Sequence, residues 1–277
     1  MQRFTQDGIE LTVPEFCGQG VSLFVNPSAR AGHGYASHPI LRNVHTVWDP
    51  QKFIIPRKPI IVGTVKDRSS FCARGVPRTL DMPIKFPGTD YRLPIELAQF
   101  KEVLETIIGF EHAINSHADE YYAYVTVDQG EVRQGETQRR GGLHADGFQG
   151  ARFQPKIYIN RSYIVADMVP TVFYDQPFKT AHMDEAKHNF FLDFDRQAQE
   201  ACVWRPEPFE IVLMDAYTVH RSDSATRACV RTFLRMSYAV NTFDRLGNAH
   251  NPLFDYNWDM VPRDAQANLI PYAGQIP

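Results

Sequence analysis

Residue types that bind metals occur in a fixed order in this 277-residue chain: His144-Ala145-Asp146, then His220 further along. Two imidazoles and one carboxylate form the ligand set that holds a non-haem Fe(II) on one face and leaves its other positions open. Two arginines, Arg231 and Arg235, follow His220 by 11 and 15 residues. A guanidinium can bind a carboxylate through two parallel hydrogen bonds. The order therefore predicts an iron centre beside a site for a dicarboxylate co-substrate.

The His-x-Asp triplet occurs three times in the chain, so its position must identify the metal-binding copy. His117-Ala118-Asp119 follows a predicted helix, where a histidine interacts favourably with the helix dipole. His182-Met183-Asp184 lies only 38 residues before His220, which leaves room for few strands between them. His144 and Asp146 precede His220 by more than 70 residues, and on a strand their side chains would share a face. We predict the metal site there, with a structural His–Asp pair as the alternative.

The two arginines lie on a predicted strand, residues 229–238, whose side chains alternate between two faces. The face that holds Leu234 and Met236 is apolar and is predicted to be core. The other face carries Arg231, Phe233 and Arg235, and it is either exposed to solvent or the wall of a polar cavity. Charge counting favours the cavity. Fe(II) with one carboxylate ligand and a bound 2-oxoglutarate leaves one net negative charge, which a guanidinium would neutralise.

The composition predicts a soluble protein with a small-molecule substrate. A net charge of −3 gives no general attraction to nucleic acid or to an anionic membrane. No stretch approaches the roughly 18 apolar residues that span a bilayer, and no apolar run near Met1 resembles a signal peptide. The four cysteines lack C-x-x-C spacing, which argues against a disulfide framework or a zinc–thiolate site. We therefore expect a cytoplasmic protein without nucleic-acid or membrane partners; its oligomeric state stays open.

The hydrophobic pattern predicts one domain over residues 1–277, mostly β with flanking helices. Residues 1–95 are rich in turn residues, hold short strand candidates at 21–25 and 60–65, and are expected to cover the core or form a lid. Apolar residues at helical spacing follow Pro94 and predict a helix against a sheet. Residues 120–240 change to a period of two and predict an antiparallel barrel or sandwich, with the tail 241–277 wrapping it. The strands expected there are 121–127, 156–159, 163–165, 172–174, 211–214 and 230–240.

Taken together, the triplet His144-Ala145-Asp146, His220 and the arginines resemble the signature of the Fe(II)/2-oxoglutarate-dependent dioxygenases, whose fold is a double-stranded β-helix (jelly-roll, cupin-like) barrel. The spacing of Arg231 is similar to that in the phytanoyl-CoA and ectoine hydroxylase branch. The presence of Arg235 as well resembles the taurine dioxygenase branch, in which a threonine also binds the co-substrate; Thr171 lies at the corresponding distance beyond His144. The resemblance implies Fe(II), 2-oxoglutarate and O₂. It leaves open which arginine takes the distal carboxylate.

The resemblance implies an oxygenase that hydroxylates, or otherwise oxidises, an unactivated C–H bond and releases succinate and CO₂. We expect its substrate to be a small polar, amino-acid-like metabolite. Two alternatives stand beside this: a cupin-like metalloenzyme that does not use 2-oxoglutarate, and a non-catalytic β-barrel binding protein. Adjacent arginines can equally form a solvated turn, and a phenylalanine can equally be core. The substrate-binding candidates, for which these structural roles are the alternative, are Gln138, Arg139, Arg140, Phe148, Gln149 and Tyr217.

Overall fold

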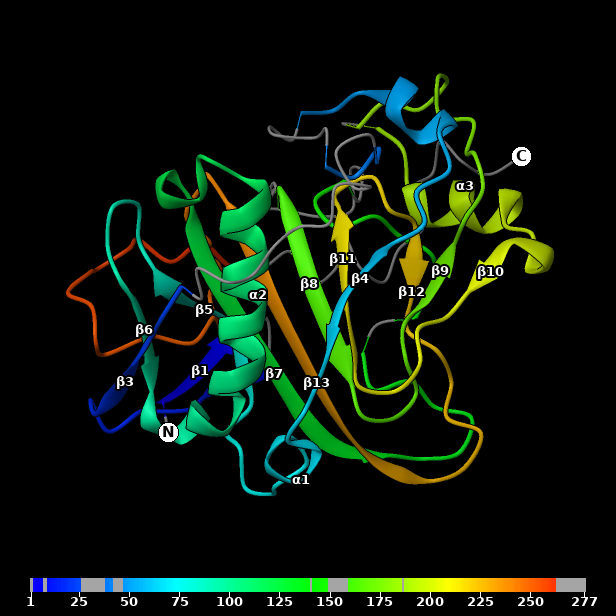
Figure 1. The fold of residues 1–277 in the computed structure, drawn as a ribbon. Helices are drawn as coiled ribbons and strands as arrows, with labels where there is room; N and C mark the ends of the chain where they lie inside the picture. Colours follow the sequence, from blue (N-terminus) through cyan, green and yellow to red (C-terminus); the bar gives the residue numbers. More distant parts are fainter. Residues whose placement is uncertain are drawn as a thin grey trace.

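A six-stranded antiparallel sheet in the order β4-β11-β8-β13-β7-β5 forms the centre of the computed structural model (Figure 1). The structure describes residues 2–6, 9–25, 38–41, 47–139, 141–148, 159–185 and 187–262. The longest strands, β7 and β13, pair along eleven residues each. The strands of this sheet are β4 (Ile60–Thr64), β5 (Thr79–Lys85), β7 (Tyr122–Val132), β8 (Arg161–Ala166), β11 (Glu210–Asp215) and β13 (Cys229–Ala239).

Smaller sheets and short helices surround this sheet. A three-stranded sheet has the order β10-β9-β12, and β1 pairs with β2 as β3 does with β6. The strands of these sheets are β1 (Gln2–Gln6), β2 (Ile9–Val13), β3 (Gly20–Leu23), β6 (Tyr91–Pro94), β9 (Val172–Tyr174), β10 (Val203–Trp204) and β12 (His220–Arg221). The helices are α1 (Arg68–Phe71), α2 (Lys101–Ile114) and α3 (Phe190–Gln197), with 3₁₀ turns η1 (Pro50–Ile54), η2 (Ile95–Phe100), η3 (Ala118–Glu120) and η5 (Glu200–Cys202).

The large sheet is buried on both faces, and alternate residues of its strands divide between two apolar clusters. On β13, Leu234 and Met236 belong to the larger cluster, which includes the helix α2. Phe233, on the opposite face, packs in a second cluster with Phe173 of the three-stranded sheet. Because successive side chains of a strand point to opposite faces, this alternation lets one sheet contact the helix on one side and the small sheet on the other. The two sheets therefore enclose an interior between them.

Helix α2 lies across the large sheet in Figure 1, and a buried ionic network joins the two. Glu111 of α2 is fully buried and accepts hydrogen bonds from Arg161 at 2.8 Å and from Tyr163 at 2.6 Å, both on β8. Asn115 donates to the same carboxylate at 2.7 Å. Each oxygen of Glu111 is thus satisfied, as burial of a charge requires. The network sets the position of the helix against β8.

The predictions of a mostly β, antiparallel fold and of a helix after Pro94 are confirmed. The described strands form no closed barrel, because β4 and β5 are the edges of the large sheet and the three-stranded sheet is hydrogen-bonded separately. Strand β5 is absent from the prediction, and residues 156–158 of an expected strand lie outside the described residues. None of the described helices has the length and apolar character needed to cross a membrane.

Candidate metal centre

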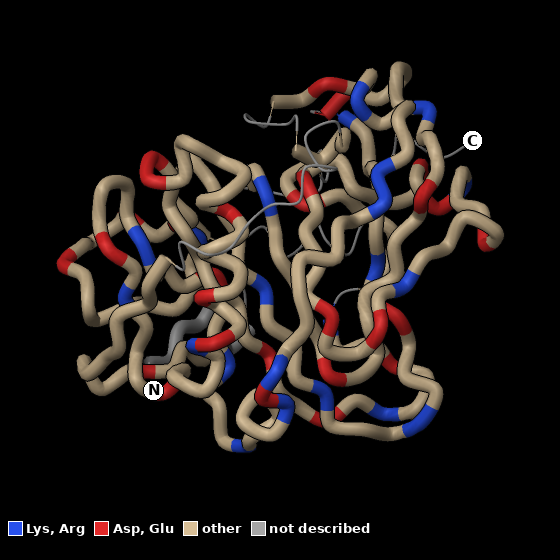
Figure 2. Tube along the Cα trace, in the orientation of Figure 1, with Lys and Arg blue, Asp and Glu red and all other residues tan. Residues whose placement is uncertain are grey.

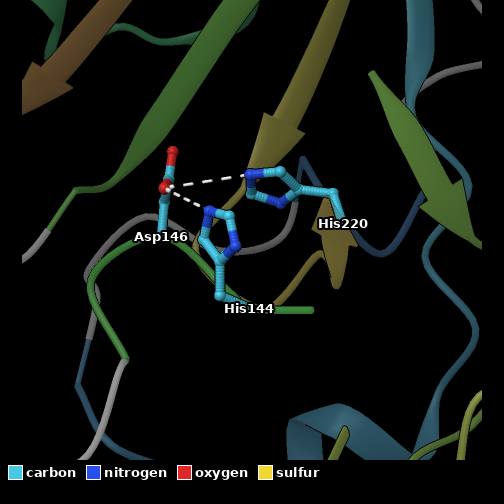
Figure 3. A group of neighbouring side chains, drawn as sticks. All are labelled: His144, Asp146 and His220. Atoms are coloured by element: carbon cyan, nitrogen blue, oxygen red, sulfur yellow. Dashed lines mark ion pairs between the residues drawn. The ribbon is translucent and has the colours of Figure 1, made fainter. Parts of the chain in front are cut away.

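Three donor atoms from separate parts of the chain meet in the interior between the two sheets. One Asp146 carboxylate oxygen lies 3.8 Å from Nε2 of His144 and 3.9 Å from Nε2 of His220. The three ligand atoms all lie within 4.8 Å of one another. Figure 3 shows the side chains pointing toward one another, with the carboxylate facing both rings. One cation can bridge such separations, because bonds to these donors are about 2.0–2.2 Å long.

Backbone hydrogen bonds determine which nitrogen each imidazole presents to the centre. Nδ1 of His144 lies 3.0 Å from the carbonyl oxygen of Gly142, and Nδ1 of His220 lies 3.0 Å from that of Thr218. A carbonyl can only accept, so Nδ1 must carry the proton in both rings. In a neutral imidazole the lone pair is then on Nε2, the atom that faces Asp146. This is the arrangement in which protein histidines commonly bind metals.

The two histidines are also held together through their backbones. The amide of His144 donates to the carbonyl of His220 at 2.9 Å, and the amide of His220 donates to the carbonyl of His144 at 2.9 Å. On its other side β12 pairs with β9, so His144 extends the three-stranded sheet by one bridge. Asp215 supports the turn that leads into His220, because its carboxylate accepts a hydrogen bond from the Thr218 hydroxyl at 2.9 Å. The ligand positions therefore depend on sheet geometry rather than on a loose loop.

Gly142 is a position where the backbone requires glycine. Its φ is +89°, and a Cβ there would lie 3.2 Å from the ring of Phe191. We predict that Gly142→Ala lowers the free energy of unfolding by about 1–2 kcal/mol, the penalty of a left-handed residue with a side chain. It should also weaken metal binding, because the Gly142 carbonyl orients His144. Chemical denaturation and metal titration measure the two effects; Gly130→Ala, where a Cβ meets nothing within 4 Å, is the control.

The Asp146 carboxylate is buried and is held by Arg235. Nη1 of Arg235 donates to Asp146 at 3.3 Å, and Nη2 donates to Asp81 at 2.7 Å. Burial is the largest influence on the pKa of Asp146 and raises it. The positive charge of Arg235, followed by those of the two imidazoles in their protonated form, acts against burial, and together they lower that pKa to about 2. The carboxylate is therefore an anion throughout the physiological pH range. An ionised oxygen donor between two imidazoles suits a hard or borderline divalent cation.

Asp81 comes from β5 and has an unusual backbone conformation. Its φ is +44°, and the pairing of β5 with β7 shifts register between Thr79 and Met82. Such a bulge redirects a side chain, and aspartate tolerates the left-handed region better than most residues. The Thr126 hydroxyl donates to Asp81 at 2.9 Å. The bulge thus supplies the second carboxylate that fixes Arg235.

Arg231, four residues before Arg235, has a different environment. Its Nε donates to the carbonyls of Met168 and Val169 at 2.9 and 3.0 Å, and its Nη1 donates to the amide oxygen of Gln138. The residue is 3% exposed, and no carboxylate within the described ranges forms an ion pair with it. Burial lowers the pKa of Arg231 to about 10, so it remains charged at neutral pH. It is a buried cation bonded only to neutral groups.

A cavity of about 330 Å³ opens beside the three donors, at the small end of the range of ligand pockets, roughly 300–1,000 Å³. Phe233 and Arg235 of the large sheet line it, as do His220 of the small sheet and Thr171 just before β9. Phe233 and Arg235 on the polar face of β13 therefore line a cavity, whereas Arg231 on the same face is buried and is not among the lining residues. Of the two environments that the alternation of the strand allows, a cavity wall and not an exposed surface is present at Phe233 and Arg235. The cavity places a polar, partly open space directly against the candidate metal ligands.

The predicted substrate-binding residues fall into two groups. Gln138 and Arg139 line the cavity. Phe148 and Tyr217 are buried in an apolar cluster with Phe53, with ring centroids 5.0 Å apart, and are not among the residues that line the cavity. Arg140 and Gln149 lie outside the described residues.

The other two His-x-Asp triplets lie away from this centre. His117 faces Glu120 at 2.9 Å with more than half of its side chain exposed. His182 is similarly exposed and faces Asp193 at 3.5 Å. Each histidine thus has an acidic neighbour, and within the described part of the chain neither joins a second histidine in a group of metal donors. These triplets are not part of the donor group formed by His144, Asp146 and His220.

Several charged residues of the cavity are absent from the sequence prediction. Asp81 and Arg78 come from the N-terminal part of the chain, Asp128 from β7, and Arg245 from the segment after β13. For Asp128, the alternation of β7 is a usable signal, because it pairs opposite Phe233 on the cavity face. For the others, no motif or period connects them to the metal ligands in the sequence.

Comparisons with known proteins give only distant likenesses. No protein-family model matches the chain, and no curated protein matches it. Similar solved structures include EvdO2 from Micromonospora carbonacea var. aurantiaca, with 13% identity, a TM-score of 0.34, and coverage of 60% of this chain and 69% of that one. Another is an oxidoreductase of the 2OG-Fe(II) oxygenase family from Burkholderia pseudomallei, with 12% identity, a TM-score of 0.32, and coverage of 72% and 76%. Likenesses this distant carry no inference, so the chemistry of the site must be inferred from its side chains.

Proposed function

We propose that this protein is a non-haem Fe(II)/2-oxoglutarate-dependent oxygenase that oxidises a C–H bond of a small polar metabolite. The observation that carries the proposal is the donor set: two imidazoles with Nδ1 bound to carbonyls and an ionised carboxylate, all facing one point at the edge of a polar cavity. Three protein ligands leave positions for a co-substrate and O₂. The resemblance of the sequence motif to that superfamily supports the same assignment.

His144, Asp146 and His220 would hold the iron. The bound iron and 2-oxoglutarate would supply the oxidising chemistry, with succinate and CO₂ as products. The protein orients the ligands and limits the access of water. Asp146 and the imidazoles are buried or nearly so, and Arg235 keeps the carboxylate ionised and in place. An enclosed site of this kind strengthens each electrostatic contact.

We assign the distal carboxylate of 2-oxoglutarate to Arg231 rather than to Arg235. Arg235 is already engaged by two carboxylates, Asp81 and Asp146. Arg231 is buried without a carboxylate among the described residues, and its neighbour Gln138 lines the cavity together with Thr171. An incoming carboxylate would replace Gln138 as the partner of Nη1 and neutralise a buried charge. Thr171 would add a hydroxyl donor to the same carboxylate.

Anaerobic titration of the purified protein tests the proposal. Fe(II) followed by 2-oxoglutarate should produce a weak visible charge-transfer band, because the keto acid would chelate the metal. Arg231→Gln should keep the affinity for Fe(II) but weaken that for 2-oxoglutarate by about 10–100-fold, the value of one charge-assisted interaction.

Arg221→Gln is the matched control, since Arg221 lies beside His220 but donates to Tyr174. It should leave the 2-oxoglutarate titration unchanged. If the wild-type protein binds Fe(II) and develops no band with 2-oxoglutarate, the co-substrate assignment is wrong.

A further inference from the structure

We propose that the cavity binds its substrate through a carboxylate group and that Arg139 is the residue that receives it. This inference rests on the proposed function, and it specifies the chemical class of the substrate. It depends on the contacts of Arg139 and on the distribution of charge around Asp128. Arg139 and Asp128 both line the cavity.

Arg139 is oriented but not bonded. Its guanidinium lies over the ring of Phe233, 5.0 Å from the ring centroid, and about a quarter of its side chain is exposed, within the cavity. The closest carboxylate is that of Asp128 at 3.8 Å, too far for a hydrogen bond. The side chain donates no hydrogen bond to any residue that the structure describes. A stacked planar fork with unused donors is a receptor for a carboxylate.

The charges on this side of the cavity leave one positive charge in excess. Asp128 is shared by Arg139 and by Arg78, which lies 3.6 Å away and is largely exposed. Two guanidiniums therefore face one carboxylate. Among the other charged residues, Arg235 and Arg231 offset Asp81 and Asp146, and a divalent cation with doubly charged 2-oxoglutarate would add no net charge. Arg245 lines the cavity as well. The positive charge beside Asp128 is therefore not neutralised by loading and favours an anionic substrate.

The excess is a local property of the cavity. Along the chain, acidic and basic residues are interspersed in both halves of the molecule (Figure 2), and the net charge is −3. The net charge of the protein would therefore contribute little to the binding free energy of an anion. A guanidinium that is largely shielded from water would contribute much more. The volume of about 330 Å³ must also hold the co-substrate, so the substrate is small. The structure thus favours a small carboxylate, a class that includes amino acids and simple organic acids.

Binding of small acids and their neutral amides to the Zn(II)-loaded protein with saturating 2-oxoglutarate tests this assignment. Zinc keeps the complex inert and diamagnetic for saturation-transfer difference NMR. The test compounds are benzoate, phenylacetate, hexanoate and N-acetylglycine, each beside its primary amide. Where an acid binds, it should bind at least about 10-fold more tightly than its amide, since a charge-assisted hydrogen bond is lost in the amide.

Arg139→Gln should reduce the affinity for the acid to that for the amide, and Arg139→Lys should retain part of the difference. Arg133→Gln is the control, because Arg133 is exposed, pairs with Glu136 and does not line the cavity; it should leave the difference unchanged. Affinity for 2-oxoglutarate should stay near wild type in Arg139→Gln. The inference is overturned if no acid binds, if amides bind as well as acids, or if Arg139→Gln weakens 2-oxoglutarate as much as Arg231→Gln does. If the wild type binds neither Zn(II) nor 2-oxoglutarate, the proposed function itself fails.

Discussion

Replacing Asp146 with asparagine should lower the affinity of the protein for Fe(II) by more than about 100-fold, because loss of an outer-shell partner alone typically costs 10–100-fold. Asp146 is the only anion among the three donors, and its pKa of about 2 keeps it ionised at neutral pH. An amide of the same shape removes that charge and leaves Arg235 with only Asp81 as a charged partner. Anaerobic calorimetry with Fe(II), repeated with Mn(II), measures the change.

A matched control comes from another His-x-Asp triplet. Asp184→Asn makes the same chemical change in His182-Met183-Asp184, at a partly exposed position near Lys187. It should bind Fe(II) as the wild type does. Thermal unfolding of both apo variants separates a lost ligand from a lost fold. Near-normal metal affinity in a folded Asp146→Asn protein would refute the assigned ligand set.

Replacing Glu111 with alanine should lower the free energy of unfolding by about 3–5 kcal/mol, the usual cost of removing one partner from a buried ion pair. Arg161 is 2% exposed and would keep its charge in the interior without a carboxylate. Tyr163 and Asn115 would each lose a hydrogen-bond acceptor as well. Because the pair joins α2 to β8, the destabilisation should affect the whole sheet. Urea denaturation followed by circular dichroism gives the value.

Glu136→Ala is the control for this change, since Glu136 forms an exposed pair with Arg133 at 3.8 Å. Exposed pairs contribute about 0–1 kcal/mol, so this variant should be nearly as stable as the wild type. Glu111→Gln, which keeps the shape and one acceptor oxygen, should be intermediate. Equal stabilities for Glu111→Ala and Glu136→Ala would show that the network contributes nothing beyond an ordinary surface contact.

The sequence predicts those parts of the molecule that depend on period and spacing. The two-residue period of 230–240 places Leu234 and Met236 on one face and Phe233 and Arg235 on the other. In the structure the first face is core, as predicted, and Phe233 and Arg235 line the cavity. The two-residue offset between His144 and Asp146 predicts that they share a face, and they meet His220 in the structure. Each of these inferences needs only the local geometry of a strand and, for the metal site, enough residues between Asp146 and His220 to form the intervening strands.

Other parts depend on contacts that no local rule encodes. β5 contains Pro83 and a residue with positive φ, both of which argue against a strand, yet its edge position tolerates them. Asp81 reaches Arg235 only because of that irregularity. Phe148 follows the triplet His144-Ala145-Asp146 and suggests a cavity residue, but the turn after Asp146 directs it into an apolar cluster. Which side of a turn a side chain takes is decided by packing partners distant in the sequence.

The reciprocal backbone hydrogen bonds between His144 and His220 have a consequence for ion selectivity. Because peptide geometry sets the spacing of the two rings, the protein has little freedom to widen the gap for a larger ion. Calcium, which prefers six to eight oxygen ligands at about 2.3–2.6 Å, would find too few oxygens and nitrogens set too close. Transition ions with shorter bonds and an affinity for imidazole would fit without rearrangement, so discrimination among them would depend on cellular supply and on the proposed co-substrate.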